Sequence, residues 1–298
     1  MRFFDTYTGF WRRWKLLYVI YNIFNYSKLK ANKSIYKKYG LKRSVFMPLH
    51  SKHFEKLPRM PQIVKESSWS SKGYEIIPGV FSLEEIDNLN QLIEEHLEKG
   101  SLGFNYTGRK IHFAYEQIPQ IRKMMVHPEI KDRLEHHMGD EIRPFQSINF
   151  HYGSEQQAHS DSIHMSTYPE GGLIAAWIAL DDIEEDNGPL FYYPGSHKAP
   201  YATNKDIGAS TSFMLSKNPN KLYEEYVHRQ LEQHEWQKEV FYAKKGDVLI
   251  WHGNLLHGGM PHLNMNKTRR SLVIHYFRKE VICYHEISQR PAIMNYNL

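Results

Sequence analysis

The second half of this chain is a succession of short apolar stretches, rich in β-branched and aromatic residues and separated by turn residues. From residue 142 onward they include QSINFHYG, LIAAWIAL, GPLFYYPGSH, GDVLIWHG and RRSLVIHYFRK. Many short strands bury their apolar faces by forming a sandwich or a barrel. Helical patterns come earlier in the chain. We therefore predict an α+β fold that is mainly β, with a sandwich or barrel core and flanking helices.

Two helices are predicted ahead of these strands. Ser82 and Glu85 form a capping-box pattern at the start of residues 83–99, and Gly100 ends the apolar periodicity. A second helix is predicted over residues 128–138.

A polar and charged stretch interrupts the strands at about residues 204–239, and residues 221–238 within it have helical character. Such a stretch between strands is typical of a surface insertion. Two interpretations stay open. The pattern favours a solvated helix, and the alternative is a lid over a substrate pocket.

Charge is unevenly distributed along the chain. Residues 1–66 hold 15 Lys and Arg against 3 Asp and Glu, a net charge of +12, whereas residues 67–298 hold 23 against 30, a net charge of −7. We predict a basic, aromatic N-terminal segment over residues 1–66 and one larger domain over residues 67–298. The acidic balance of that domain disfavours nucleic acid as a partner.

The N-terminal segment divides into an amphipathic helix pattern over residues 1–26 and an irregular, Lys-rich connector over residues 28–66. Aromatic and apolar side chains recur every three or four residues along one side of that helix: Phe3, Tyr7, Phe10, Trp14, Leu17, Tyr21 and Phe24. The favoured interpretation is that this stripe docks on the body of the protein. The alternative is peripheral contact with a membrane surface.

Cysteine content and the N-terminal pattern predict a compartment. The single cysteine, Cys283, excludes an internal disulfide and Cys-based metal sites. Charges interrupt what would be the apolar region of a signal peptide. The longest apolar run, residues 16–24, is shorter than the roughly 20 residues that a bilayer span needs. The expected location is therefore the cytoplasm.

The strongest candidate for chemistry is the pair His159 and Asp161 in QQAHSDSIHM. Side chains at i and i+2 on an extended strand point the same way, so an imidazole and a carboxylate can bind one metal ion. A third ligand has to come from a distant strand, and His257 is the best candidate, with His252 as its rival. Other histidines, His275 among them, are predicted to be structural. Two imidazoles and one carboxylate leave open positions, which suits Fe(II) better than zinc.

Arg269 follows His257 at the start of a strand. A planar guanidinium binds a carboxylate through two hydrogen bonds, which a lysine cannot do. A metal site with an arginine nearby indicates a dicarboxylate cosubstrate that chelates the metal through one end and is anchored at the other.

The pattern HSD…WIALDD…NGPLFYYPGSHK…HGG…RRSL resembles the phytanoyl-CoA dioxygenase family over roughly residues 75–280. The resemblance implies a double-stranded β-helix, that is, a cupin-like jelly roll. It also implies an Fe(II)- and 2-oxoglutarate-dependent oxygenase that consumes O2. His159, Asp161 and His257 match the iron ligands of the family, and Arg269 matches the residue that binds the distal carboxylate of 2-oxoglutarate.

The resemblance implies two further residues at the cosubstrate. Trp177 matches an aromatic residue that lines the pocket, although core packing explains this tryptophan equally well, and Gln146 matches a polar pocket residue. In one departure, Gly259 stands where a hydroxyl residue often helps to hold the cosubstrate. The spacing also leaves open whether Arg269 or Arg270 is the anchor, because neighbours on a strand point to opposite faces.

The function implied by the resemblance is hydroxylation, or another oxidation of a C–H bond, in a small organic molecule, with release of succinate and CO2. Asp161 favours hydroxylation, because related halogenases have a small residue there. One alternative is a metal-dependent jelly-roll enzyme that does not use 2-oxoglutarate. Another is a membrane-surface or assembly module with a vestigial metal site. The resemblance leaves the substrate open.

Overall fold

The computed structural model describes residues 68–103, 109–209, 218–287 and 290–291. The predicted N-terminal helix and its connector lie outside this part of the chain.

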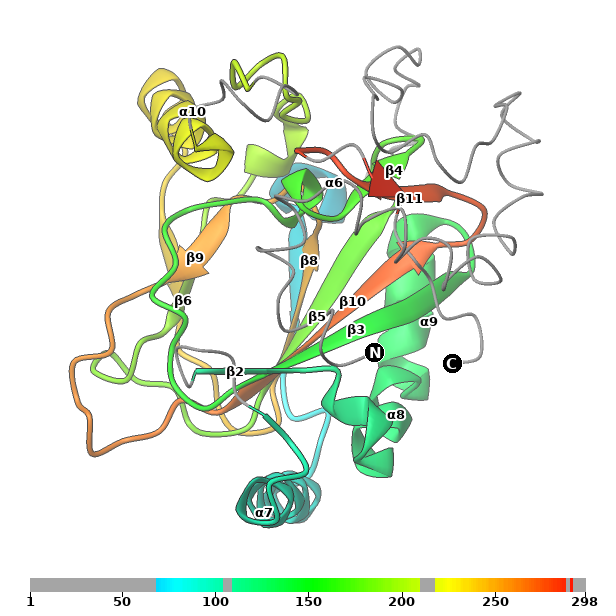
Figure 1. The fold of residues 1–298 in the computed structure, drawn as a ribbon, viewed down its shortest axis with the longest axis vertical. Coiled ribbons are helices and arrows are strands. Elements are labelled where there is room, and N and C mark those ends of the chain that lie inside the picture. The colour runs from blue at the N-terminus through cyan, green and yellow to red at the C-terminus, as the bar shows by residue number, and fades with distance from the viewer. Residues whose placement is uncertain (1–67, 104–108, 210–217, 288–289, 292–298) are drawn as a thin grey trace, which may run out of the picture.

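The largest element is a six-stranded sheet in the order β1-β8-β5-β10-β3-β2 (Figure 1). Each strand runs antiparallel to its neighbours. The strands in sheet order are β1 (Tyr74–Ile77), β8 (Val248–His252), β5 (Leu173–Ala179), β10 (Ser271–Arg278), β3 (Ile142–Phe150) and β2 (Lys110–His112).

Two three-stranded antiparallel sheets accompany it. One consists of β7 (Glu239–Phe241), β6 (Leu190–Tyr192) and β9 (His257–Gly259), and the other of β12 (Arg290–Pro291), β11 (Ile282–His285) and β4 (Ser166–Tyr168). Side chains of β6 and β7 pack against the inner face of the large sheet. This double layer of antiparallel strands confirms the predicted mainly-β jelly roll.

Strand β5 shows how the core is divided. All of its residues are buried. Ile174, Ala176 and Ile178 pack toward the helices on the outer face of the sheet, whereas Ala175 and Trp177 face the smaller layer. A strand that is covered on both faces is apolar without alternation, which is the pattern of LIAAWIA.

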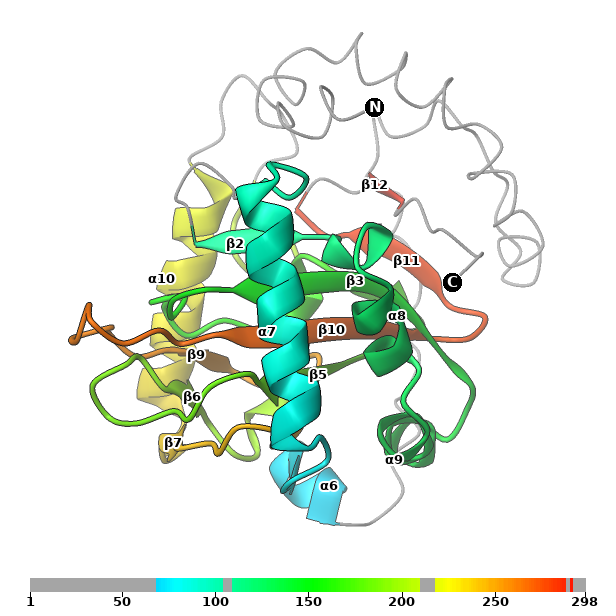
Figure 2. The same ribbon diagram turned by 90° about the horizontal axis from the view of Figure 1, so that it is seen from below.

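Three helices cover the outer face of the large sheet (Figure 2): α7 (Leu83–Glu98), α8 (Pro119–Met125) and α9 (Pro128–Met138). The helices predicted over residues 83–99 and 128–138 are confirmed, and the capping box of Ser82 and Glu85 forms. Sequence reasoning missed α8 and β1, because elements this short carry little periodicity. None of the described helices is long and apolar enough to cross a membrane.

The remaining helical elements are α6 (Ser68–Lys72), the 3-10 turns η3 (Ala114–Glu116), η4 (Asp161–Ile163) and η5 (Ser196–Lys198), and α10 (Pro219–Gln233). Helix α10 lies within the predicted insertion. Tyr223 and Val227 form its buried face, in a cluster with Ile163 and Leu256. The helix is therefore docked on the body along one side and solvated along the other.

Candidate metal centre

Backbone pairing brings the two histidines of the predicted metal site side by side. His159 and His257 form an isolated antiparallel bridge, in which each backbone N–H donates to the other residue's carbonyl at 2.9 Å. His257 begins β9, and Asp161 begins η4. Two segments that are far apart in the sequence thus place three polar side chains together.

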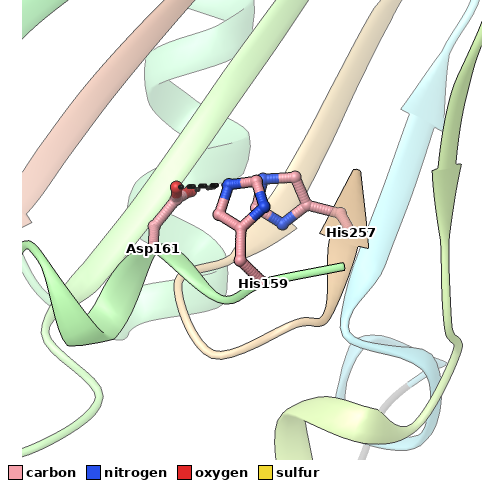
Figure 3. A group of neighbouring side chains, drawn as sticks. All are labelled: His159, Asp161 and His257. Atoms are coloured by element: carbon pink, nitrogen blue, oxygen red, sulfur yellow. Dashed lines mark ion pairs between the residues drawn. The ribbon is translucent and has the colours of Figure 1, made fainter. Parts of the chain in front are cut away.

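The side chains of His159, Asp161 and His257 converge (Figure 3). Each offers one ligand atom, and these atoms all lie within 4.8 Å of one another. Oδ1 of Asp161 is 3.9 Å from Nε2 of His159, and Oδ2 is 3.8 Å from Nε2 of His257. Within the described ranges this is the only such group of three or more potential ligands, and His252 is not part of it.

Hydrogen bonds set the tautomer of both rings. Nδ1 of His159 is 2.9 Å from the carbonyl oxygen of Gln157, and Nδ1 of His257 is 3.0 Å from that of Leu255. A carbonyl oxygen only accepts, so each Nδ1 carries the proton and each Nε2 keeps a lone pair. This is the arrangement that orients histidine ligands of metal ions.

The charge states also suit a metal ion. Burial lowers the pKa of His159 to about 3, with a further lowering from His257, so the ring is neutral at physiological pH. Burial alone would raise the pKa of Asp161, but His257 and His275 outweigh it and hold the pKa below its usual value. Neutral imidazoles and an ionised carboxylate are the metal-binding forms. A donor set of two nitrogens and one carboxylate fits Fe(II) with positions left for other ligands.

Two side chains from the large sheet contact the carboxylate of Asp161. The indole N–H of Trp251, on β8, donates to Oδ2 at 2.9 Å. Nε2 of His275, on β10, lies 3.4 Å from the same oxygen. His275 stays outside the ligand group, as predicted, but sequence reasoning missed its contact with a ligand. The signal was the alternation on β10, which puts His275 on the same face as Val273.

Arg269 is 2% exposed and lies directly before β10. Its Nε donates to the carbonyl of Gly188 at 3.1 Å, and its Nη1 donates to the hydroxyl of Ser271 at 2.8 Å. The guanidinium carbon is 4.9 Å from the ring centre of Trp177. No carboxylate in the described part of the chain forms an ion pair with it. Burial lowers the pKa of Arg269 to about 10, against the attraction of Asp181.

Arg270 points the other way. Its Nη2 and Nε lie 2.8 and 3.0 Å from Oδ1 of Asp181, and its side chain is 28% exposed. Of the two arginines, only Arg269 lies beside Trp177 on the inner side of the sheet.

Trp177 and Gln146 also lie on the large sheet. Trp177 is opposite Val273 in the register of β5 and β10, and its indole N–H has no hydrogen-bond partner among the described residues. Gln146 is opposite His275 in the register of β3 and β10. Trp177 packs against Phe241 as well, so its packing and a pocket role are compatible.

Gly259 has a steric explanation. A Cβ at this position would lie 2.6 Å from Oγ of Ser154 and 2.9 Å from the backbone nitrogen of Glu155, so no side chain fits without movement. The hydroxyl that contacts Arg269 belongs instead to Ser271.

Lys110 is a further neighbour of the site that sequence reasoning did not place there. It lies on the edge strand β2, opposite Phe150, and its Nζ donates to Oε1 of Gln156 at 2.8 Å. Burial lowers the pKa of Lys110, whereas the charge of Asp161 raises it. Lys110 is therefore close enough to the site for the charge of Asp161 to act on it. A strand of three residues gives no pattern from which to infer its orientation.

The fold and the site together define a jelly-roll protein with a His-x-Asp…His metal-binding group. This chain belongs to the phytanoyl-CoA dioxygenase family, whose model (Phytanoyl-CoA dioxygenase) matches residues 69–271. The predicted family resemblance is confirmed.

Relatives and solved structures agree with this assignment. Phytanoyl-CoA dioxygenase domain-containing protein 1 of Rattus norvegicus is 26% identical over 133 residues, which are 42% of this chain and 40% of that protein. The chain thus spans less than half of that relative's length. SnoK, a non-heme alpha ketoglutarate dependent carbocyclase from nogalamycin biosynthesis, matches 74% of this chain and 85% of its own with a TM-score of 0.58 and 20% identity.

EctD from S. alaskensis, in a structure with 2-oxoglutarate and 5-hydroxyectoine, matches 80% of this chain and 92% of its own. Its TM-score is 0.59, and its sequence identity is 18%. Another structure of EctD holds iron. At this level of identity the similarity establishes the fold.

Proposed function

We propose that this protein is an Fe(II)- and 2-oxoglutarate-dependent dioxygenase that oxidises a C–H bond of a small organic molecule and releases succinate and CO2. One observation carries the proposal: the guanidinium of Arg269 is buried and forms no ion pair with a carboxylate of the described residues, in a fold that also holds a His-Asp-His group. An isolated buried cation is costly. The far carboxylate of a keto-diacid supplies the missing partner, in the two-point geometry that a guanidinium favours.

The site lies along one connected wall. Asp161 accepts a hydrogen bond from Trp251 on β8, and Trp251 is opposite Ala175 on β5. Trp177 lies two residues after Ala175 on β5, and its ring contacts the guanidinium of Arg269. A ligand on this wall can meet the metal-binding group at one end and the guanidinium at the other.

The side chains have separate roles in this proposal. His159, Asp161 and His257 hold the iron through Nε2, a carboxylate oxygen and Nε2. Arg269, itself positioned by Ser271, holds the far carboxylate. Bound iron and 2-oxoglutarate supply the activation of O2 that the protein's own groups cannot provide. The protein contributes orientation of the ligands and exclusion of water from the buried site.

Trp177 and Gln146 are proposed to line the cosubstrate pocket, Trp177 with its ring and its unpartnered indole N–H, Gln146 with its amide. The substrate is proposed to be a small molecule, because the similar EctD structure holds 5-hydroxyectoine and SnoK acts in nogalamycin biosynthesis. Asp161 offers a carboxylate where related halogenases have a small residue, which favours hydroxylation or another oxidation over halogenation.

A metal-dependent jelly-roll enzyme that does not use 2-oxoglutarate is the second candidate, and it is disfavoured by the buried Arg269, which has no carboxylate partner among the described residues. A vestigial site in a membrane-surface or assembly module is disfavoured by the two oriented imidazoles of His159 and His257. Docking of residues 1–26 on the body, and the alternative of contact with a membrane, stay predictions because those residues lie outside the described ranges. A cytoplasmic location also stays a prediction.

The test is anaerobic addition of Fe(II) and 2-oxoglutarate to the purified full chain, followed by O2. We expect a weak visible charge-transfer band before O2 is added, and succinate formation after it. Metal binding without the band or succinate would favour the second candidate. Absence of metal binding would favour a vestigial site.

A further inference from the structure

Helix α10 contacts the metal-binding motif between two of its ligands. The hydroxyl oxygen of Tyr223 accepts from the backbone N–H of Ser160 at 2.8 Å and lies 2.9 Å from Oγ of Ser160. Ser160 is the residue between His159 and Asp161. Tyr223 is 4% exposed, and burial raises its pKa to about 12. The hydroxyl therefore keeps its proton and can donate it to Oγ of Ser160.

The contact continues as a chain of buried hydrogen bonds toward the third ligand. Oγ of Ser160 is 3.0 Å from Oγ of Ser162, which donates to Oδ1 of Asn254 at 2.9 Å. Asn254 lies in the turn that leads from β8 to His257. If Tyr223 donates to Ser160, each hydroxyl in the chain accepts one hydrogen bond and donates the next, so the bonds polarise one another.

We propose that Tyr223 is a positioning residue for the metal centre: from the insertion helix α10 it fixes the segment that spaces His159 and Asp161. The inference rests on the proposed function in one respect, namely that a metal ion binds at the His-Asp-His group. The i and i+2 ligands keep their separation only if the backbone at Ser160 keeps its conformation. The hydroxyl of Tyr223 is a hydrogen-bond partner of that backbone N–H from outside the motif.

The ring of Tyr223 has a second role that a test must separate from the first. Together with Val227 it forms the buried face of α10, in a cluster with Ile163 and Leu256. Loss of the ring would therefore loosen the helix whatever the hydroxyl does. Tyr223→Phe removes the hydroxyl and keeps the ring.

Two variants of the same helix serve as matched controls. Tyr226→Phe removes a hydroxyl three residues further on, from a ring that stacks at 6.4 Å on that of Tyr223 but lies outside the hydrogen-bond chain. Val227→Ala removes buried packing and leaves every bond of the chain in place.

The experiment measures the Kd of Fe(II) for the metal-free full chain by anaerobic calorimetry, together with urea unfolding of the same metal-free samples. Partners that orient metal ligands typically change metal affinity by 10- to 100-fold, and Tyr223 acts through the backbone. We therefore expect Tyr223→Phe to raise the Kd about tenfold. Tyr226→Phe and Val227→Ala should keep the wild-type Kd, although Val227→Ala lowers the urea midpoint.

A second variant, Ser160→Ala, keeps the bond from the backbone N–H to Tyr223 and removes both hydrogen bonds of Oγ, to the hydroxyls of Tyr223 and Ser162. It should raise the Kd less than Tyr223→Phe does, and it tests the chain even if Tyr223→Phe does not fold. An unchanged Kd in both variants, with wild-type protein that binds Fe(II), overturns the positioning role alone. An equal rise in Val227→Ala also overturns it, in favour of helix docking in general. Wild-type protein that binds no Fe(II) overturns the proposed function and this inference together.

Discussion

The metal-site pair of histidines, His159 and His257, has a close counterpart in a core pair, His197 and His252. The ring centres of the metal-site pair are 4.5 Å apart with a 47° angle between planes, and those of the core pair are 5.3 Å apart with a 57° angle. Burial lowers the pKa of His159 and of His252 to about 3. Close approach of two rings, and a histidine that burial keeps neutral, are therefore common to both pairs and do not by themselves make a metal site.

The tautomer separates the two pairs. In the metal-site pair each Nδ1 donates to a carbonyl, which leaves Nε2 free to bind a metal. In the core pair, Nδ1 of His252 accepts from the backbone N–H of Asn254 at 3.1 Å. The proton of the neutral ring is then on Nε2, which faces the hydroxyl of Tyr201 at 3.5 Å. His252 thus lacks the free Nε2 that a ligand needs.

The carboxylate is the second difference. Asp161 lies within 4 Å of both rings of the metal-site pair, whereas no carboxylate of the described residues forms an ion pair with either ring of the core pair. A tryptophan lies beside each pair. The ring centres of Trp251 and His257 are 4.8 Å apart, and those of Trp69 and His252 are 6.3 Å apart. Among the described residues, the indole N–H of Trp251 donates to a carboxylate and that of Trp69 does not.

The largest expected effect comes from removal of that carboxylate. Asp161→Ala should lower Fe(II) affinity by more than roughly 100-fold and abolish turnover of 2-oxoglutarate, because it removes a direct ligand rather than an orienting partner. The fold should persist by circular dichroism. Calorimetry measures Fe(II) binding, and succinate detection measures turnover. His252→Asn is the matched control, which should retain wild-type Fe(II) affinity and turnover. Wild-type turnover by Asp161→Ala would refute the iron assignment.

Removal of the buried guanidinium should have the next largest effect. Arg269→Ala should raise the KM for 2-oxoglutarate about 100-fold, since it leaves a buried carboxylate without its charged partner. Fe(II) affinity in the absence of 2-oxoglutarate should change little. Arg270→Ala is the control: it breaks the pair with Asp181 and should leave this KM unchanged. If Arg270→Ala raised the KM for 2-oxoglutarate more than Arg269→Ala does, Arg270 would be the anchor instead of Arg269.

His252 of the core pair should make the free energy of unfolding depend on pH. The folded-state pKa of His252 is about 3, below its ordinary value of 6.5, because burial disfavours the charged ring. The unfolded chain then binds one more proton as the pH falls below 6.5, so stability is lost on acidification. Between pH 6.5 and pH 4.5 this histidine should contribute a loss of about 2 kcal/mol in the free energy of unfolding.

Urea unfolding of the metal-free protein across that range measures this contribution. His252→Asn, which keeps an acceptor for the N–H of Asn254, should give a shallower pH dependence than wild type at an unchanged Kd for Fe(II). An identical pH dependence would show that His252 is not held neutral.

The extent to which the site could be predicted from sequence follows from the range of the interactions involved. His159 and Asp161 could be predicted because spacing of i and i+2 is a local property of an extended chain. His257 and Arg269 could be proposed only as candidates until the family pattern supported them, since nothing local pairs β9 with the bridge at His159. The choice between Arg269 and Arg270 depends on the register of β10 against its neighbours, which only the folded sheet determines.

The fold shows the same division between local and distant interactions. Local sequence patterns predict the ends of two helices, namely α7, which has a capping box at Ser82, and α9. Strand β1 pairs with the distant β8, and its four residues carry no pattern of their own. The contact of Tyr223 with Ser160 could not be predicted from sequence either, because it depends on how α10 docks on the body.

The smallest expected effect concerns the tryptophans beside the two histidine pairs, Trp251 and Trp69. Trp251→Phe keeps an aromatic ring beside His257 but removes the N–H that bonds to Oδ2 of Asp161, so the carboxylate can rotate away from its binding orientation. We expect the Kd for Fe(II) to rise about tenfold, as for other partners of metal ligands. Trp69→Phe, the matched change beside His252, should leave that Kd unchanged, although it alters the stacking of Trp69 on His137. Equal effects of the two substitutions would mean that the indoles act through packing alone, and the contrast between the pairs would then rest on tautomer and carboxylate.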